Sequence, residues 1–566
     1  MFARRFSKFS RVVVLVAIAG AVLCPTTAAG AATGSEYATT TLPGGFDGIV
    51  TDPTTHRVFV SDVPSLAITV FDENGAVVAH LDPAGPGAMV VHDGKLYTAS
   101  AHYTSIFKYD TASLHDAYLL AQNQVLSPAP ALAWANGRLW TTTGDCHAGA
   151  SQLMSVDPDT GDAVVHDPIP GLTGCVDLVS SPTEPNMLVG FEPGAQFIRL
   201  VRLDVSTGVP VVQADAPVDC YNPQQIAFTP DGSSILAACG SPYHLVELSS
   251  DTLQETGRVY QTGAYPGAVA IDPRFGQIAG GNVNQYDTDV RVFQQGASSP
   301  SWTQDYNGNY YPEPSLVSRG LAWHADGNTL YAVTKDSNNT FELHVVAGPT
   351  ATTLASSPST SGYGQPTTLT ATVQGAASGQ FPPDGDVTFT DGTSDLGHAQ
   401  LNGGTATLVT STLAMGTHSV VASFAGTRSG APSVSAPLTV QVQPAPSTTT
   451  LEQWPGYEKS LPGGAVRLTV TVTPAADYDV AQGTVTVYDG DKALTTETVY
   501  GGVDYPIVTL YDVGVHHLRA VYSGDANIGP STSNTVDHPV VLCEDNALYL
   551  VFTNPPRVCA LTPLPH

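Results

Sequence analysis

The stretch Gln225-Ile-Ala-Phe-Thr-Pro-Asp-Gly232, followed by Ile235-Leu-Ala-Ala-Cys239, places a short apolar run on each side of a tight turn. The same pattern returns as Gly320-Leu-Ala-Trp-His-Ala-Asp-Gly327, followed by Leu330-Tyr-Ala-Val-Thr334. An apolar run of four to eight residues that is bounded by Pro, Asp and Gly is typical of a buried strand that ends in a turn. The pattern therefore predicts a repeated strand–turn–strand unit.

The unit recurs seven times between Phe46 and Val346, with a third strand in most copies. The first-strand apolar residues of the seven copies are 40 to 52 residues apart: Ile49, Met89, Leu132, Leu178, Ile226, Val269 and Leu321. A repeat of this length that contains only strands predicts the blades of a propeller. The last copy lacks an outer strand, and we expect residues 37–42 to supply it, because this pairing would cover two sheet edges at once.

This repeat resembles the secreted propellers of the YVTN and NHL types over about 310 residues, through its period rather than through a diagnostic motif. The resemblance implies a seven-bladed β-propeller at residues 36–348. It also implies that the loops entering the innermost strands and the loops joining second to third strands lie on one face.

A second repeat, with an offset of 98 residues, follows Gly348. Gly385-Asp-Val-Thr-Phe-Thr-Asp-Gly392 returns at 483–490, and Gly416-Thr-His-Ser-Val-Val-Ala-Ser-Phe424 returns at 514–522. Alternating strands in a unit of about 100 residues predict an immunoglobulin-type sandwich. The copies resemble bacterial Ig-like domains of group 3, which implies sandwiches at 350–443 and 447–540 that act as spacers or adhesive modules. The predicted fold class is all-β: a seven-bladed β-propeller plus two tandem immunoglobulin-like β-sandwiches.

The first 31 residues predict a secretory signal peptide. Four basic residues precede an apolar run from Val12 to Leu23, and Ala29-Gly30-Ala31 is the expected cleavage motif. The apolar run is too short for a membrane anchor, which needs about 20 residues. We therefore expect a protein outside the cell, secreted or associated with the cell surface, with no membrane insertion after cleavage.

The charge of the chain argues against two classes of partner. Its formal net charge is −29, and it becomes −33 without the leader, which holds four of the 21 basic residues and no acid. Such a surface repels phosphate backbones and anionic lipids, so we expect no nucleic acid partner. No nucleophile elbow, zinc-binding helix motif or P-loop occurs, so we predict no metal and no cofactor.

Six cysteines follow the leader, and fifteen pairings are possible from the sequence alone: Cys146, Cys175, Cys220, Cys239, Cys543 and Cys559. An even number in an exported chain favours disulfides. The face implied by the propeller resemblance brings Cys146 near Cys175 and Cys220 near Cys239. A bridge from Cys543 to Cys559 would close a C-terminal extension at 541–566.

The same mapping gathers aromatic and polar residues on one face of the propeller. The candidates for a ligand-binding face are Phe46, Asp47, Asp62, Tyr103, Tyr221, Tyr243, Tyr286, Arg319 and Lys335. If the chain is an enzyme, His102, Asp145 and His147 are the candidate acid, base and orienting groups. Each of these residues is also explained as an ordinary loop residue. In the sandwiches, His418 matches one member of the His516-His517 pair, which favours a structural role for that histidine.

Three functions remain open. In the first, the propeller recognises a cell-wall polymer, a glycan or a protein, and the Ig-like domains are spacers. In the second, the propeller is a lyase or hydrolase with its site at the channel mouth. In the third, the chain is a structural component of the envelope or matrix. The expected chain is a monomer.

Overall fold

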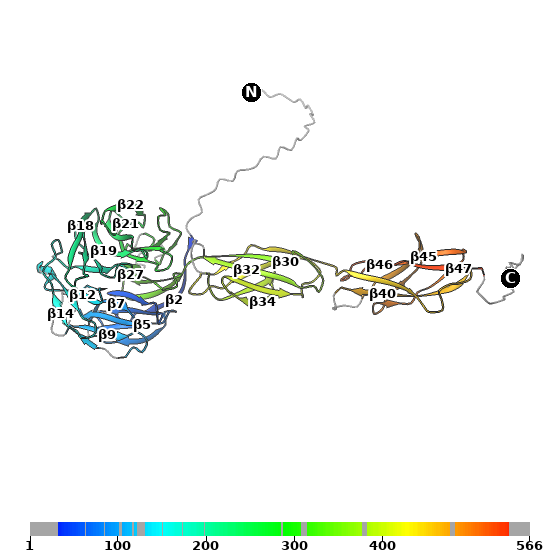
Figure 1. Cartoon of the computed structure of the whole chain (residues 1–566), viewed down its shortest axis with the longest axis horizontal. Helices are drawn as coiled ribbons and strands as arrows, with labels where there is room; N and C mark the ends of the chain where they lie inside the picture. The colour runs from blue at the N-terminus through cyan, green and yellow to red at the C-terminus, as the bar shows by residue number, and fades with distance from the viewer. Residues whose placement is uncertain are drawn as a thin grey trace, which may run out of the picture.

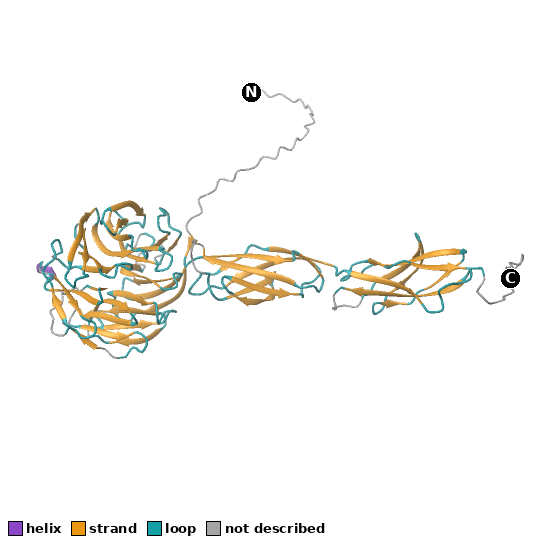
Figure 2. Cartoon of the chain, viewed as in Figure 1, coloured by secondary structure: helices purple, strands orange, loops and turns teal. Residues whose placement is uncertain are grey.

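The computed structural model describes residues 32–542, except for 63, 84, 101–104, 116–117, 122–130, 150, 173, 197, 285–286, 307–313, 376–381 and 476–480. The predicted leader and C-terminal extension, with Cys543 and Cys559, lie outside these residues, as do His102, Tyr103 and Tyr286. The described chain is built of strands and one short 3₁₀ helix, η1 (Cys146–Ala148), as Figure 2 shows. No helix in the described part is long and apolar enough to cross a membrane.

Seven small sheets make up the described residues before Gly348, and they are numbered here in chain order. Sheet 1 contains β3 (Gly48–Asp52), β4 (Arg57–Asp62), β5 (Ala67–Phe71) and β6 (Val77–Leu81). Sheet 2 contains β7 (Pro86–His92), β8 (Lys95–Ser100), β9 (Ile106–Asp110) and β10 (Tyr118–Leu120). Sheet 3 contains β11 (Leu132–Ala135), β12 (Arg138–Thr143), β13 (Gln152–Val156) and β14 (Ala163–Val165). Sheet 4 contains β15 (Asp177–Ser180), β16 (Met187–Phe191), β17 (Ile198–Asp204) and β18 (Val211–Val218).

The other three sheets complete the set. Sheet 5 contains β19 (Tyr221–Phe228), β20 (Ser234–Ser241), β21 (His244–Ser249) and β22 (Glu255–Tyr260). Sheet 6 contains β23 (Pro266–Ile271), β24 (Ile278–Asn282), β25 (Val290–Phe293), β26 (Trp302–Gln304) and β1 (Ala32–Thr33). Sheet 7 contains β27 (Ser315–Trp323), β28 (Thr329–Lys335), β29 (Phe341–Ala347) and β2 (Ser35–Thr41).

The innermost strands of the sheets form a closed ring. Each one contacts the next, in the order β3, β7, β11, β15, β19, β23, β27, and β27 then contacts β3. The expected closing strand is present, because β2 pairs antiparallel with β29 from Thr41 opposite Glu342 to Ser35 opposite Ala347. This part of the chain is therefore a β-propeller that the two ends of its own segment close (Figure 1). The sequence did not predict β1, which adds in parallel to β26.

Apolar side chains fill the spaces between neighbouring sheets. Trp140, Tyr331 and Phe59 are fully buried there, because alternate residues of each strand face an adjacent sheet. The Trp140 indole donates to the carbonyl of Ala135 at 3.0 Å. This packing makes the ring a rigid scaffold for the loops on its two faces.

Two sandwiches follow the propeller. The first contains β30 (Thr350–Ser357), β31 (Thr360–Gly362), β32 (Thr367–Gly375), β33 (Asp386–Asp391), β34 (Ser394–Gln400), β35 (Thr405–Thr410), β36 (Gly416–Phe424), β37 (Ser433–Val434) and β38 (Leu438–Gln443). The second contains β39 (Ser447–Gln453), β40 (Gly464–Pro474), β41 (Thr484–Asp489), β42 (Lys492–Thr498), β43 (Val503–Asp504), β44 (Ile507–Leu510), β45 (Gly514–Tyr522), β46 (Ser531–Thr532) and β47 (Val536–Val540).

The two sandwiches share a histidine clamp. His418 Nδ1 lies 2.7 Å from Asp391 Oδ2, and its Nε2 lies 2.7 Å from the Ala414 carbonyl. His516 makes the same two contacts, to Asp489 at 2.6 Å and to the Asp512 carbonyl at 2.8 Å. Each clamp joins β36 to β33, or β45 to β41, so the structural role predicted for this position is confirmed.

The linker between the sandwiches is fixed to the second one. The backbone of Ala445 exchanges hydrogen bonds with Asn527 and Gly529, both at 2.8 Å, and Ala445 is 2% exposed. Figure 1 shows the two sandwiches end to end, extending away from the propeller.

Candidate functional site

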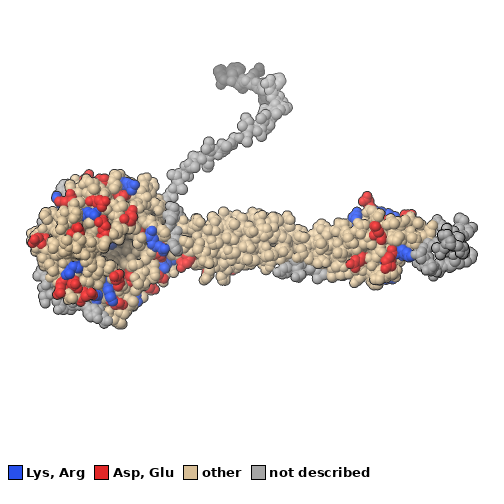
Figure 3. Space-filling view, in the orientation of Figure 1, with Lys and Arg blue, Asp and Glu red and all other residues tan. Residues whose placement is uncertain are grey.

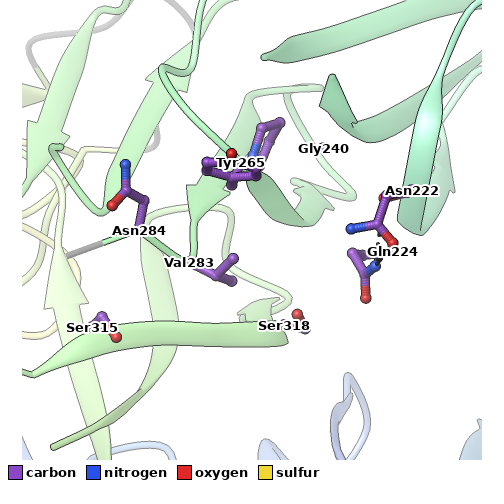
Figure 4. Close-up of a pocket in the computed structure, with 9 residues that line it drawn as sticks. Asn222, Gln224, Gly240, Tyr265, Val283, Asn284, Ser315 and Ser318 are labelled. Atoms are coloured by element: carbon purple, nitrogen blue, oxygen red, sulfur yellow. Dashed lines mark hydrogen bonds between the residues drawn. The ribbon is translucent and has the colours of Figure 1, made fainter. Parts of the chain in front are cut away.

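A polar pocket opens on the propeller face that the sequence singled out, between sheets 5, 6 and 7 (Figure 4). Its volume is about 350 Å³, within the range of small-molecule sites. It is lined by amide, hydroxyl and apolar groups from the ends of innermost strands and from the loops beside them: Asn222, Gln224, Gly240, Tyr265, Pro266, Val283, Asn284, Ser315 and Ser318. None of these residues carries a charge.

Four residues around this pocket have a left-handed backbone. Asn222, Tyr243, Tyr265 and Arg319 have φ angles of 52°, 69°, 57° and 62°. A left-handed backbone is unfavourable for bulky residues, at about 1–3 kcal/mol each, and persists where the surrounding structure imposes it. Local hydrogen bonds impose it here: Asn222 donates from its backbone to Ala195 at 3.0 Å, and Val283 donates to Tyr265 at 3.1 Å.

Two exposed tyrosines stand beside the pocket. Tyr243 and Tyr265 are 43% and 50% exposed, and their rings meet edge to face with centroids 5.1 Å apart. The hydrogen bond between the two phenols, followed by the charge of Tyr265, raises the pKa of Tyr243. The Tyr243 phenol therefore stays neutral and can donate and accept hydrogen bonds at neutral pH.

A disulfide supports the loops beneath the tyrosines. Cys220 and Cys239 are bonded, as predicted, and both are fully buried. The bridge joins the start of β19 to β20, next to Tyr221, which is 38% exposed, and to the pocket residue Gly240. A Cβ at Gly240 would lie 3.2 Å from the Asn222 side chain, so this close approach favours glycine.

An ion pair crosses the propeller channel beside the pocket. Arg319, from β27, places Nη2 2.9 Å from Asp177 Oδ2 on β15, and its Nε donates to the Gln224 carbonyl at 3.2 Å. Asp47 lies in the same channel. Burial raises the pKa of Asp47, the Arg319 guanidinium lowers it and the Asp177 carboxylate raises it again, with a net increase. One guanidinium thus faces two carboxylates in the channel, and it pairs directly with Asp177.

The other predicted face residues lie outside the pocket. Phe46 packs into the apolar cluster between sheets 1 and 7. Asp62 is buried and accepts the backbone N–H of Ser65 at 3.2 Å within its own turn. Lys335 lies over the Phe341 ring at 5.6 Å and is paired in register with the pocket residue Ser315.

The described members of the catalytic set are exposed. His147 Nδ1 lies 3.8 Å from Asp145 Oδ1, and their side chains are 74% and 64% exposed. Cys175 is disulfide-bonded, and His147 Nε2 lies 4.0 Å from its sulfur. The side chain of Cys146 is not among those described, so its pairing with Cys175 stays a prediction.

The sequence predictions missed most of the pocket lining. Tyr265 precedes an innermost strand, so the loop mapping that selected Tyr221 would also have selected it. Nothing in the sequence distinguishes the pocket residues Asn222, Gln224, Ser315 and Ser318 from other residues, because polar residues are common at strand ends.

Comparison with known proteins agrees with the two sandwiches. Residues 354–443 and 457–541 match the family described as bacterial Ig-like domain (group 3). The chain carries two domains of this family. No curated protein matches the chain.

Two solved structures are similar to the propeller segment. One is the β-propeller domain of Cps50 (Swd1) from Myceliophteria thermophila, at 13% identity, covering 56% of this chain and 99% of that one, with a TM-score of 0.43. The other is Kuenenia stuttgartiensis hydrazine synthase, at 16% identity, covering 54% and 96%, with a TM-score of 0.41. These scores are too low to support an argument about function.

Proposed function

We propose that this chain is an exported binding protein whose propeller pocket recognises a neutral glycan, such as a segment of a cell-wall polysaccharide. The observation that carries the proposal is the uncharged, amide- and hydroxyl-lined pocket beside two exposed tyrosines, in a chain whose formal net charge is −29. A phosphate or carboxylate ligand would need a cationic group, and the nearby Arg319 already pairs with Asp177.

The chemistry of the pocket suits sugar hydroxyls. Gln224 Nε2 donates to Asn222 Oδ1 at 2.9 Å, and this pair still presents the Asn222 amide N–H groups as donors and the Gln224 amide oxygen as an acceptor, which suits a vicinal diol. The ring faces of Tyr243 and Tyr265 suit the apolar face of a pyranose. The buried disulfide and the strained backbone fix these groups before a ligand arrives, which lowers the entropy lost on binding.

The sandwiches support a role as spacers. They continue in line from the propeller, so they would hold the pocket away from whatever anchors the other end (Figure 1). The predicted leader and the disulfide both favour a place outside the cell.

Binding and turnover are tested together with the chain from residue 32 onward. The protein is incubated with a glycan array and with cell-wall fractions, and retention and soluble product are scored. Tyr243→Asn and Tyr265→Asn remove the rings with a residue that tolerates positive φ. We expect each variant to weaken retention by about tenfold, which corresponds to about 1.4 kcal/mol. The matched control is Tyr500→Asn, because Tyr500 is 80% exposed on the second sandwich.

Three outcomes would contradict the proposal. Retention that is unchanged in both variants would place the ligand elsewhere. Retention of proteins alone would replace the glycan with a protein ligand. Release of a soluble product would favour a lyase or hydrolase.

A further inference from the structure

Two histidines and a glutamate converge where sheet 1 meets sheet 7. His56 comes from the turn between β3 and β4, Glu73 from the turn between β5 and β6, and His324 from the turn between β27 and β28. His56 Nδ1 lies 3.1 Å from His324 Nε2, which lies 3.8 Å from Glu73 Oε2. All three ligand atoms lie within 4.8 Å of one another. These turns join first to second and third to fourth strands, so the cluster is on the propeller face opposite the pocket.

The buried histidine directs its Nε2 toward the other two residues. The His324 side chain is 2% exposed, its Nδ1 lies 2.9 Å from Asp326 Oδ2, and the Asp326 backbone N–H donates to the same Nδ1 at 3.2 Å. Asp326 therefore holds the ring through Nδ1, which leaves Nε2 as the nitrogen that faces His56 and Glu73. A carboxylate on the far nitrogen is the usual support for a metal-binding histidine.

The charge around the cluster favours a divalent cation. Two carboxylates, Glu73 and Asp326, share the one guanidinium of Arg428, so one negative charge is left over beside the histidines. Arg428 itself bonds to Asp326 and lies 3.0 Å from Glu73 Oε2.

We propose that His56 Nδ1, His324 Nε2 and Glu73 Oε2 form a binding site for a zinc-like divalent transition metal ion, with Asp326 as the supporting carboxylate. Ligands about 2.1 Å from a tetrahedral ion stand about 3.4 Å apart, and the separations of 3.1 and 3.8 Å bracket this value. Two imidazoles and one carboxylate suit zinc, whereas Ca²⁺ and Mg²⁺ prefer oxygen ligands. His56 is exposed, so an ion reaches the site directly from solvent.

The ion would join sheet 1 to sheet 7, where the ring of the propeller closes. In sheet 7, β2 from the start of the propeller pairs with β29 from its end, and two of the three ligands lie on the neighbouring sheet 1. Arg428, which contacts the glutamate ligand and Asp326, comes from the first sandwich, and the Thr329 hydroxyl of sheet 7 donates to its carbonyl at 2.9 Å. Metal binding would therefore stabilise both the ring closure and the junction with the first sandwich.

The test uses the whole chain from residue 32, freed of metal with EDTA and carrying no histidine tag. Zinc chloride is titrated by calorimetry, and Co²⁺ is followed by its visible absorption, which reports coordination geometry. His56→Ala and Glu73→Gln change exposed or half-exposed ligands and leave the buried His324 in place. His147→Ala is the control, because this imidazole also lies beside a carboxylate and is 74% exposed.

We expect one equivalent of zinc, a tetrahedral Co²⁺ spectrum and a rise in the melting temperature of the propeller with zinc. His56→Ala and Glu73→Gln should each weaken zinc binding at least about tenfold, and His147→Ala should not. Three results would overturn the proposal: no zinc binding, zinc binding that both ligand variants leave unchanged, or a preference for Ca²⁺ or Mg²⁺ over zinc.

Discussion

His344 in the propeller and His418 in the first sandwich have pKa values that are shifted in opposite directions. His344 of β29 is buried between the sheets, with its Nε2 2.8 Å from the Thr334 hydroxyl, and burial lowers its pKa to about 4. Burial would also lower the pKa of His418 in the first sandwich, but the hydrogen bonds to Asp391 and Ala414 raise it overall. Among the described residues, His344 is enclosed between strands without a pKa-raising partner, whereas His418 is paired with the Asp391 carboxylate.

The two sandwiches differ mainly in their surfaces. Residues 350–443 contain five charged residues, and residues 447–540 contain fifteen, a contrast that is visible in Figure 3. The second sandwich also exposes Tyr500, Tyr505 and Tyr511, by 80%, 58% and 72%. The shared clamp and core therefore belong to the fold, whereas the surface is free to differ between copies.

Removal of the closing strand should have the largest effect on the stability of the propeller relative to that of the sandwiches. Deletion of residues 35–41 leaves β29 with an unpaired edge and opens the ring. We expect the unfolding transition of the propeller to disappear from a calorimetric scan while the transitions of the sandwiches remain. Tyr37→Ser is the control, because it changes an exposed residue of the same strand. Survival of the propeller transition within a few degrees would show that closure is dispensable.

Removal of the disulfide should weaken the propeller alone. Cys220 and Cys239 are 19 residues apart, and a loop of this length is worth about 3 kcal/mol in the chain-entropy model. The double variant Cys220→Ala/Cys239→Ala should lower the free energy of unfolding of the propeller by about this amount. The sandwiches, which contain no cysteine between residues 350 and 540, are the internal control. A uniform loss across all transitions would contradict this expectation.

Acid should change the stability of the propeller and the stability of the first sandwich in opposite directions. The folded pKa of His344, about 4, lies below the ordinary value of 6.5, so its contribution is present above pH 6.5 and is lost as the pH falls toward 4. At pH 5 the free energy of unfolding has lost about 2 kcal/mol of this contribution. Glu36, whose Oε2 is 3.5 Å from His344 Nδ1, faces this histidine. The folded pKa of His418 is raised, so its contribution is present below pH 6.5 and is lost as the pH rises through the folded value.

The measurement is the melting temperature of each transition from pH 8 to pH 5. We expect the propeller to lose stability relative to the first sandwich, and His344→Gln should reduce the loss. A propeller whose pH dependence is the same in His344→Gln would rule out this histidine as the cause.

The smallest loss of stability should come from variants of the two histidine clamps. Asp391→Asn removes a charged partner from His418, whose side chain is 11% exposed, and should cost the first sandwich about 1 kcal/mol at pH 6. Asp489→Asn should do the same to the second sandwich through His516. Chemical denaturation followed domain by domain checks both variants. A loss in only one copy would show that the clamps are not equivalent.

Local sequence was enough for the architecture. The period of the strand–turn–strand unit predicted a propeller, and the 98-residue offset predicted two sandwiches, because strand alternation and turn residues are local properties. The closing strand was also predictable, since a seventh unit with a missing outer strand leaves one obvious donor. The Cys220–Cys239 bridge followed from the same loop mapping.

Only the tertiary structure brought together residues that lie on different sheets. The pocket combines Asn222, Tyr265 and Ser318 from three sheets, and the proposed metal site combines His56 and Glu73 with His324, which is 251 residues beyond Glu73. No spacing in the chain encodes such meetings, because the closed ring of the propeller sets them. The sequence by itself therefore determined the strands, the repeats and the closure, whereas the packing of neighbouring sheets decided which polar side chains meet.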